Sequence, residues 1–246
     1  HLAGVGNYDD VPGWRDGLQK YQARALPAEL QGADMLLASA DVFAFAPLMS
    51  TPGSAYRYST FGSMLAGAVI SKAGNAPYLQ QFEQRIRQPL GLTTMRPDHS
   101  TIAIPHRVSG YYQEQGQVKK RDDDDVAWKL AGGGFTSNVG DLTRYMQALI
   151  NQELLPAAAH QKMWTSQTTS EGKATGYGLS FSVARHGQDT EIGHFGAQTK
   201  TRTVLSFLPE KKLGVVIMCN SEWANLGPVR DALLKALKSS SLSSTR

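Results

Sequence analysis

Four strand-sized apolar runs, all after Gly176, constrain the fold of this chain more than any other feature of its sequence. The runs lie at residues 177–184, 191–196, 203–208 and 213–219. Between the last two, Pro209-Glu210-Lys211-Lys212 has the length and composition of a hairpin turn. Short connections of this kind join antiparallel neighbours. The runs therefore predict an antiparallel meander, which a helix over residues 223–237 follows.

Helical periodicity dominates the chain before these runs. Apolar residues recur at three- and four-residue spacing from Phe61 to Val69, and again from Tyr78 to Ile86. Helices first, then a meander, then a closing helix are typical of an α+β fold. We therefore predict an antiparallel sheet flanked by helices, with a helical subdomain.

We interpret the 246 residues as part of a single domain. A mainly helical subdomain with loops is expected over residues 1–175, and the sheet with the C-terminal helix over residues 176–238. Residues 239–246 are rich in serine and have little to pack against, so they are predicted to form a flexible tail.

Charge and composition exclude several classes of protein. The chain has 25 Lys and Arg against 21 Asp and Glu, and its longest basic block is Lys119-Lys120-Arg121, so no nucleic-acid partner is predicted. The one cysteine, Cys219, excludes an intrachain disulfide. No apolar run reaches the ~18 residues that a membrane-spanning helix needs.

Several catalytic and cofactor motifs are absent from the sequence. It contains no Gly-x-Ser-x-Gly, no phosphate-binding loop and no His-x-x-x-His pair. The acidic run at residues 122–125 could attract a cation, but four adjacent side chains cannot all converge on one metal. We expect this run to lie in a solvated loop, and we predict neither a cofactor nor a metal.

Three short segments carry candidate chemistry, and each also has an ordinary structural explanation. In Tyr58-Ser59-Thr60, the phenol of Tyr58 could move a proton if positive neighbours lower its pKa. Alternatively, this segment could serve only as a helix cap. Residues 131–137, Ala-Gly-Gly-Gly-Phe-Thr-Ser, could form a tight turn with Ser137 as the next cap. His194-Phe195-Gly196-Ala197 could bring a ligand close to a strand, or hold only a structural histidine.

In their order along the chain, these segments resemble the serine β-lactamase-like and penicillin-binding family, which includes class C β-lactamases, D-alanyl-D-alanine carboxypeptidases and related esterases. Two further segments join them. The matching segments are His1-Leu2-Ala3-Gly4 (His-Thr-Ser-Gly in the family), Pro52-Gly53 with Tyr58-Ser59-Thr60 (Pro-Gly and Tyr-Ser-Asn), Pro89-Leu90-Gly91-Leu92, residues 131–137 with Asp141-Leu142, and His194-Phe195-Gly196 (His-x-Gly or Lys-Thr-Gly). The sequence looks most similar to the LACTB-like branch, and the resemblance covers nearly the whole chain.

The resemblance implies a mechanism. A serine of a Ser-x-x-Lys motif attacks an amide, ester or lactam carbonyl, the lysine and the motif tyrosine move the proton, and two backbone N–H groups hold the oxyanion.

When the roles of the family's motif residues are carried over to this sequence, Tyr58 is the catalytic proton-relay residue. Thr60, His194, Gly196 and Ala197 line the substrate site: His194 steers a carboxylate or polar group, and the Ala197 N–H donates to the oxyanion. Thr60 departs from the usual asparagine, which weakens the case for efficient β-lactam hydrolysis.

The same resemblance puts the nucleophile before His1, outside these residues. We therefore expect the C-terminal part of a serine hydrolase, lacking the first sheet strands and the nucleophile helix and inactive as given. One sheet edge and an apolar surface should then be uncovered. The sequence Ser170-Glu171-Gly172-Lys173 is rejected as the nucleophile motif, because it follows the tyrosine motif and its glycine disfavours a helix.

Other interpretations stay open at this stage. A non-catalytic binding or assembly module could share the fold, or an unrelated α+β fold could match the motifs by chance. Cys219 ends an apolar run without a histidine nearby in sequence, so we interpret it as a buried structural thiol. The substrate could be a small molecule, a peptide or an ester. The family suggests an exported protein, with or without a membrane anchor, or a mitochondrial one, and the oligomeric state is not predicted.

Overall fold

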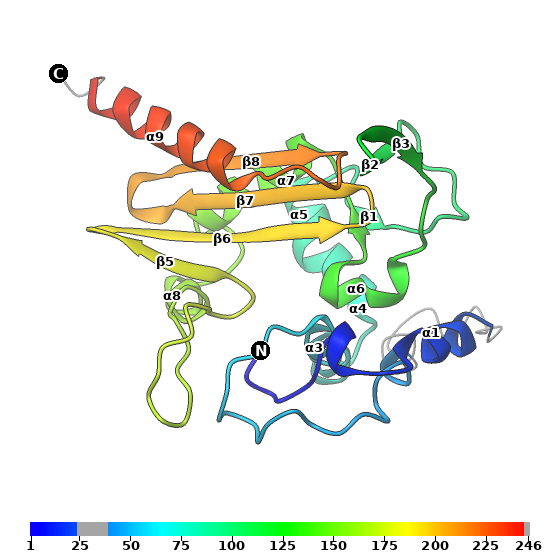
Figure 1. Ribbon diagram of the computed structural model, residues 1–246. Helices are drawn as coiled ribbons and strands as arrows, with labels where there is room; N and C mark the ends of the chain where they lie inside the picture. The colour runs from blue at the N-terminus through cyan, green and yellow to red at the C-terminus, as the bar shows by residue number, and fades with distance from the viewer. Residues whose placement is uncertain (24–38, 244–246) are drawn as a thin grey trace.

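The computed structural model describes residues 1–23 and 39–243 (Figure 1). Its helices are η1 (Tyr8–Asp10), α1 (Trp14–Ala23), α3 (Thr60–Ala73), α4 (Tyr78–Phe82), the π-helix η3 (Glu83–Arg87), α5 (Gln88–Leu90), η4 (Ala127–Lys129), α6 (Leu130–Gly133), α7 (Val139–Ile150), α8 (Ala157–Met163), η5 (Pro209–Lys211) and α9 (Gly227–Ser243). Its strands are β1 (Arg96–Pro97), β2 (Gly110–Glu114), β3 (Gln117–Arg121), β4 (Phe135–Thr136), β5 (Ser182–His186), β6 (Asp189–Gln198), β7 (Thr201–Leu208) and β8 (Leu213–Cys219). No helix in this part of the chain is long and apolar enough to span a membrane.

The main sheet is an antiparallel meander in the order β5-β6-β7-β8, which confirms the predicted α+β class. The predicted run at residues 177–184 becomes a strand only from Ser182. Before it, the Gly178 N–H donates to the Phe181 carbonyl at 2.8 Å, and the segment curls back on itself. A Cβ at Gly178 would lie 2.0 Å from the Met163 carbonyl, so the segment is packed tightly against the end of α8.

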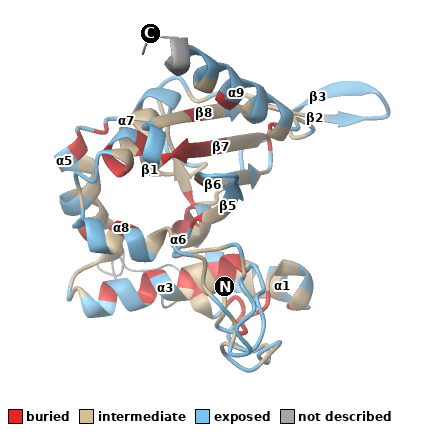
Figure 2. Ribbon diagram, turned by 90° about the vertical axis from the view of Figure 1, so that its left-hand side faces the viewer, coloured by how far each residue is buried: buried red, intermediate tan, exposed pale blue. Residues whose placement is uncertain are grey.

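Helices cover both faces of this sheet. On one face, α7 and α8 pack against β6 and β7, and Phe207 is fully buried there with its ring 5.5 Å from that of Trp164. Figure 2 shows the buried residues concentrated along β7. On the other face α9 contacts β8, and Arg230 stacks over the ring of Phe195 at 5.0 Å. This arrangement leaves the C-terminal end of β6 free to form part of a cavity.

The C-terminal helix differs from its prediction in two ways. α9 continues to Ser243, beyond the predicted helix end at residue 237 and into the segment predicted to be a flexible tail. The hydroxyls of Ser239 and Ser240 bond the carbonyls four residues earlier, which is compatible with helical backbone. The stripe Val229, Leu233 and Leu237 is exposed, although Leu234 beside it is buried.

A second hydrophobic cluster holds the N-terminal segment against α3. Phe61 is fully buried in it, stacked on Phe43 at 4.6 Å. Ser59 begins α3: its hydroxyl accepts the Gly62 N–H at 2.8 Å and donates to the Gly6 carbonyl at 2.7 Å. One side chain therefore caps the helix and ties it to the first residues of the chain.

Replacing Phe207 with alanine should lower the free energy of unfolding by about 3–5 kcal/mol, because it leaves a cavity in the cluster that joins α7, α8 and the sheet. Urea unfolding followed by circular dichroism measures this loss. The matched control Val229→Ala removes an exposed side chain and should change stability by less than about 0.5 kcal/mol. Equal losses in the two variants would contradict the packing described above.

Replacing Ser59 with alanine should cost about 1–2 kcal/mol, because the α3 cap is lost and the Gly6 carbonyl loses its donor. The exposed Ser170→Ala serves as the control and should be close to neutral. A neutral Ser59→Ala in the same urea measurements would show that the cap does not hold these segments together.

Candidate functional site

A cavity of about 540 Å³ lies between β6 and the start of α3. All five site residues predicted from the sequence line it: Tyr58, Thr60, His194, Gly196 and Ala197. The glycine-rich segment at residues 131–137 contributes further lining. The fold therefore brings the three candidate segments, which are far apart in the sequence, to one place.

Tyr58 lies directly before the α3 cap. The extended backbone of Ser59 turns the chain out of the helix axis, so the phenol of Tyr58 projects toward the sheet. Its ring centroid is 6.1 Å from that of His194, and the side chain is 40% exposed. Burial raises the pKa of Tyr58. Proton transfer by this phenol requires positive neighbours that lower its pKa, and the described residues do not produce that shift.

His194 and Gly196 lie on the cavity face of β6, where side chains two residues apart point the same way. Gly196 pairs with Thr203 of β7, and a Cβ at Gly196 would lie 2.2 Å from the Thr203 Oγ1. A side chain at this position would force the Thr203 hydroxyl to move. Burial lowers the pKa of His194, and a hydrogen bond with the Phe195 backbone opposes that shift. The imidazole is therefore held toward its neutral form.

The backbone N–H of Ala197 lies beyond the end of the β5–β6 pairing. The Gly193 carbonyl accepts a hydrogen bond from the Ser182 hydroxyl at 2.8 Å, so the backbone groups of Gly193 face β5. By strand alternation those of Phe195 and Ala197 face the same side. Because β5 begins at Ser182, opposite Gly193, no strand of the described chain pairs with Ala197 on that side.

Thr60 lies in the wall of the cavity and is only 7% exposed. Its N–H donates to the Asn7 Oδ1 at 3.1 Å, and its side chain acts on Tyr8, whose pKa it lowers against the larger, opposing effect of burial. Tyr8 in turn accepts a hydrogen bond from the Lys129 Nζ at 3.3 Å. Thr60 therefore lies beside a half-buried polar cluster of Asn7, Tyr8 and Lys129.

The glycine-rich segment forms α6 and β4. A Cβ at Gly132 would lie 2.7 Å from the Cγ2 of Thr60, so this glycine lets α6 approach the start of α3. The Gly133 carbonyl accepts the Gln198 Nε2 at 2.7 Å. The cap of α7 is Asn138, which accepts the Asp141 N–H at 2.8 Å, and the prediction of Ser137 as the cap is wrong.

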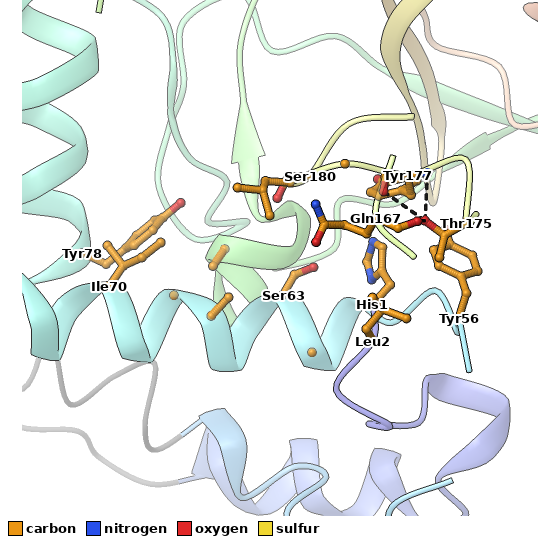
Figure 3. Close-up of a pocket in the computed structure, with 16 residues that line it drawn as sticks. His1, Leu2, Tyr56, Ser63, Ile70, Tyr78, Gln167, Thr175, Tyr177 and Ser180 are labelled. Carbon is orange, nitrogen blue, oxygen red and sulfur yellow. Dashed lines mark hydrogen bonds between the residues drawn. The ribbon is translucent and has the colours of Figure 1, made fainter. Parts of the chain in front are cut away.

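An aromatic cluster borders this cavity. The ring of His1 lies 4.3 Å from that of Tyr58 and 4.7 Å from that of Tyr177, and its Nδ1 accepts the Ser59 N–H at 3.1 Å. Figure 3 shows His1, Tyr56 and Tyr177 at one end of a neighbouring groove, whose floor is α3. From the sequence, His1 is recognised only as part of a motif, and Tyr177 has no signal that marks it as a site residue.

Lys129 was also missed by the sequence analysis. It lines the cavity, and its Nζ donates to the Gln198 Oε1 at 2.9 Å. Burial lowers the pKa of Lys129, and the charge of Asp124 opposes that shift. Its sequence signal is a single charged residue between the apolar Trp128 and Leu130, directly before the glycine-rich motif.

The rejected nucleophile motif and the cysteine lie outside this cavity. Ser170 and Lys173 are exposed in a loop in which the Thr169 N–H bonds the Lys173 carbonyl, so no helix aligns the two side chains. Cys219 ends β8 and is half-buried, whereas a buried thiol was expected. Within residues 1–23 and 39–243, no group of three or more His, Cys, Asp and Glu side chains could hold a metal ion.

Known proteins are similar to this chain over more than two thirds of its length. The chain is 26% identical over 220 residues to the human serine β-lactamase-like protein LACTB, mitochondrial, covering 73% of this chain and 40% of that protein. It is 23% identical over 189 residues to the D-alanyl-D-alanine-carboxypeptidase/endopeptidase AmpH of Escherichia coli, covering 70% of this chain and 47% of that protein. The chain thus spans less than half the length of either relative.

Solved structures show the same fold. A D-stereospecific amidohydrolase from Streptomyces sp. superposes with a TM-score of 0.69 and 24% identity, over 91% of this chain and 66% of that one. A D-amino acid amidase from Ochrobactrum anthropi gives a TM-score of 0.70 with 19% identity, over 98% of this chain and 69% of that one. The family model described as Beta-lactamase matches residues 3–238. This chain therefore belongs to the β-lactamase family.

Proposed function

We propose that this chain supplies the proton-relay and substrate-binding part of a serine hydrolase that cleaves an amide, peptide or ester bond through an acyl-enzyme. The observation that carries the proposal is the pair Tyr58 and His194, whose rings lie 6.1 Å apart at one cavity. A similar sequence, that of a D-alanyl-D-alanine carboxypeptidase, and a similar structure, that of a D-stereospecific amidohydrolase, support an amide or peptide substrate.

In the proposed reaction a serine hydroxyl attacks the substrate carbonyl. Tyr58, as the phenolate, accepts the hydroxyl proton and passes it to the leaving nitrogen or oxygen when that bond breaks. The Ala197 N–H donates to the oxyanion, and neutral His194 hydrogen-bonds the substrate. Water then attacks the acyl-enzyme ester and releases the acid and the free serine.

The nucleophile is assigned to a Ser-x-x-Lys helix outside these 246 residues. Burial raises the pKa of Tyr58, and a phenol acts as a base near neutral pH only when a nearby cation lowers that pKa. The lysine of such a motif would supply the cation. As given, the chain is expected not to form an acyl-enzyme.

Uncovered apolar surfaces support the same assignment. β8 forms one edge of the main sheet, and the exposed stripe Val229, Leu233 and Leu237 lies on α9, which packs beside that strand. On α3, Ile70 is 46% exposed and lines the groove of Figure 3. We propose that the first sheet strands and the nucleophile helix of the full-length protein cover these surfaces.

A non-catalytic binding or assembly module is the second candidate. It is favoured by the exposed loop that holds Ser170 and Lys173, because no Ser-x-x-Lys helix exists in the described chain. The two candidates differ in whether the full-length coding sequence contains such a motif before His1. We also propose an exported or organellar location, since the human relative is named as mitochondrial.

A fluorescent fluorophosphonate or penicillin should label the full-length protein and leave the 246-residue chain unlabelled, because only the former would carry the nucleophile. Labelling is read on a denaturing gel and mapped by mass spectrometry. Label on Ser170 of the shorter chain would overturn the assigned nucleophile. A full-length protein that no acylating probe labels would favour the binding module.

Replacing Tyr58 with phenylalanine in the full-length protein should reduce kcat by about 10²–10⁴-fold with little change in KM, because it removes the proton relay but keeps the ring. Hydrolysis of an activated ester measures both constants. The matched control Tyr112→Phe removes a phenol on β2, away from the cavity, and should leave both constants unchanged. Full activity of Tyr58→Phe would contradict the assigned role.

Acidification should destabilise the protein through His194. Its pKa is lowered in the folded state, so the unfolded chain binds the proton more readily below the ordinary histidine value of about 6.5. Stability from this group is complete above that pH and falls as the pH drops toward the folded pKa. Urea unfolding between pH 5 and 8 should show a smaller acid loss for His194→Gln, and identical pH slopes would contradict burial of a neutral imidazole.

A further inference from the structure

The turn between β6 and β7 contains a residue that such turns rarely use. Gln198 pairs with Thr201 across the turn, so only Thr199 and Lys200 connect the two strands. Lys200 has a φ of 71°, in the left-handed region that favours glycine. A lysine keeps this strained conformation only where its surroundings compensate for the strain, and backbone of this kind concentrates at functional sites. The contacts of Lys200 must therefore stabilise the turn.

Three contacts hold Lys200, which is only 7% exposed. Its Nζ forms an ion pair with Asp123, and its N–H donates to the Glu222 Oε1 at 2.7 Å. Its Cβ lies against Gly110 at the start of β2, where a Cβ on the glycine would come within 1.9 Å of it. The lack of a side chain at Gly110 thus allows the lysine to pack against β2.

Arginine side chains fix the two carboxylates that hold Lys200. The Arg107 Nε lies 3.6 Å from the Asp123 Oδ2, and Arg121 donates to both oxygens of Glu222 at 2.8 and 3.0 Å. The hydrogen bond from Lys200 lowers the pKa of Asp123, and that from Arg121 lowers the pKa of Glu222. Both carboxylates are therefore charged at neutral pH. Asp123 comes from the acidic run of the sequence, so this run anchors the turn.

The turn lies directly after the site residues of β6. Ala197, whose N–H is the proposed oxyanion donor, is separated from Lys200 by Gln198 and Thr199. That N–H faces the side of β6 on which no strand in the described part of the chain pairs with it. Its direction is therefore set by the pairing with β7 and by the turn in which that pairing ends. Because an oxyanion donor is effective only when it is already aimed at the developing charge, a displaced turn would weaken it.

We propose that Lys200 is a positioning residue for the reaction: its ion pair with Asp123 and its packing on Gly110 hold the β6–β7 turn so that the Ala197 N–H points at the oxyanion. This inference rests on the proposed hydrolase function and adds a residue that lies outside every motif segment of the sequence. Lys200 acts through the backbone, and its ammonium binds Asp123 rather than the substrate. Loss of either member of the ion pair should therefore have the same effect.

Steady-state kinetics of the full-length protein test this role. Lys200→Met and Asp123→Asn should each reduce kcat for an activated ester by about 10- to 100-fold with little change in KM, because a misdirected donor weakens mainly the transition state. The double variant should lose no more than either single one, because both changes break the same ion pair. Lys200→Arg keeps the charge and should retain most of the activity. Lys162→Met removes an exposed lysine on α8 and should leave both constants unchanged.

Lys200→Gly separates positioning from stability. Glycine adopts the left-handed backbone without strain, so the thermal unfolding of this variant should stay close to that of the wild type. The variant nevertheless lacks the side chain that binds Asp123, and its kcat should fall as in Lys200→Met. A side chain that only stabilised the fold would instead cause parallel losses of stability and activity.

Amide hydrogen exchange follows the turn without any turnover. A peptide covering residues 194–203 should exchange faster in Lys200→Met than in the wild type, Lys200→Arg and Lys162→Met. Unchanged exchange, a wild-type kcat in folded Lys200→Met, or a loss that Asp123→Asn does not share would overturn the proposal. Faster exchange in a protein that no acylating probe labels contradicts only the hydrolase function. Unchanged kcat in the variants of a protein that is acylated contradicts only the role of Lys200.

Discussion

The pairing of β6 with β7 is the interaction on which the site depends. In the observed register Gly196 lies opposite Thr203 and His194 opposite Leu205, so His194, Gly196 and Gln198 share one face of β6. A shift of one residue would move all three to the face covered by α9, because strand side chains alternate. The buried Phe207 and Ile192, which pack under α7, penalise that shift. The core thus sets the direction of the site residues.

The opposite wall is held by polar contacts between distant segments. Ser59 caps α3 and bonds the Gly6 carbonyl, and the ring of His1 packs against Tyr58 while its Nδ1 accepts the Ser59 N–H. The glycine-rich segment then approaches α3 closely at Gly132. The Ser59 motif caps a helix, and the glycine-rich motif forms a tight turn. Together these two structural roles place the phenol of Tyr58 at the cavity. The structural and the chemical interpretations of these segments are compatible.

The cavity favours neutral groups. Burial raises the pKa of Tyr58 and lowers the pKa values of His194 and Lys129, and in each case the uncharged form gains. In such surroundings a charge is best accommodated together with an opposite one. The proposed nucleophile motif would bring a lysine next to the phenolate, which is such an arrangement.

The sequence by itself determined the meander and the helix that starts after Ser59, because strand and helix periodicity is encoded by neighbouring residues. The five predicted site residues came from the resemblance of short motifs to a known family, and all five line the cavity. The sequence misplaced the start of β5, where tight packing on the end of α8 shapes the backbone, and it also misplaced the end of α9. Only the tertiary structure identified Lys129 and Tyr177 and the burial of Thr60. Those properties depend on segments far apart in the sequence, and desolvation by such segments leaves no local pattern in the chain.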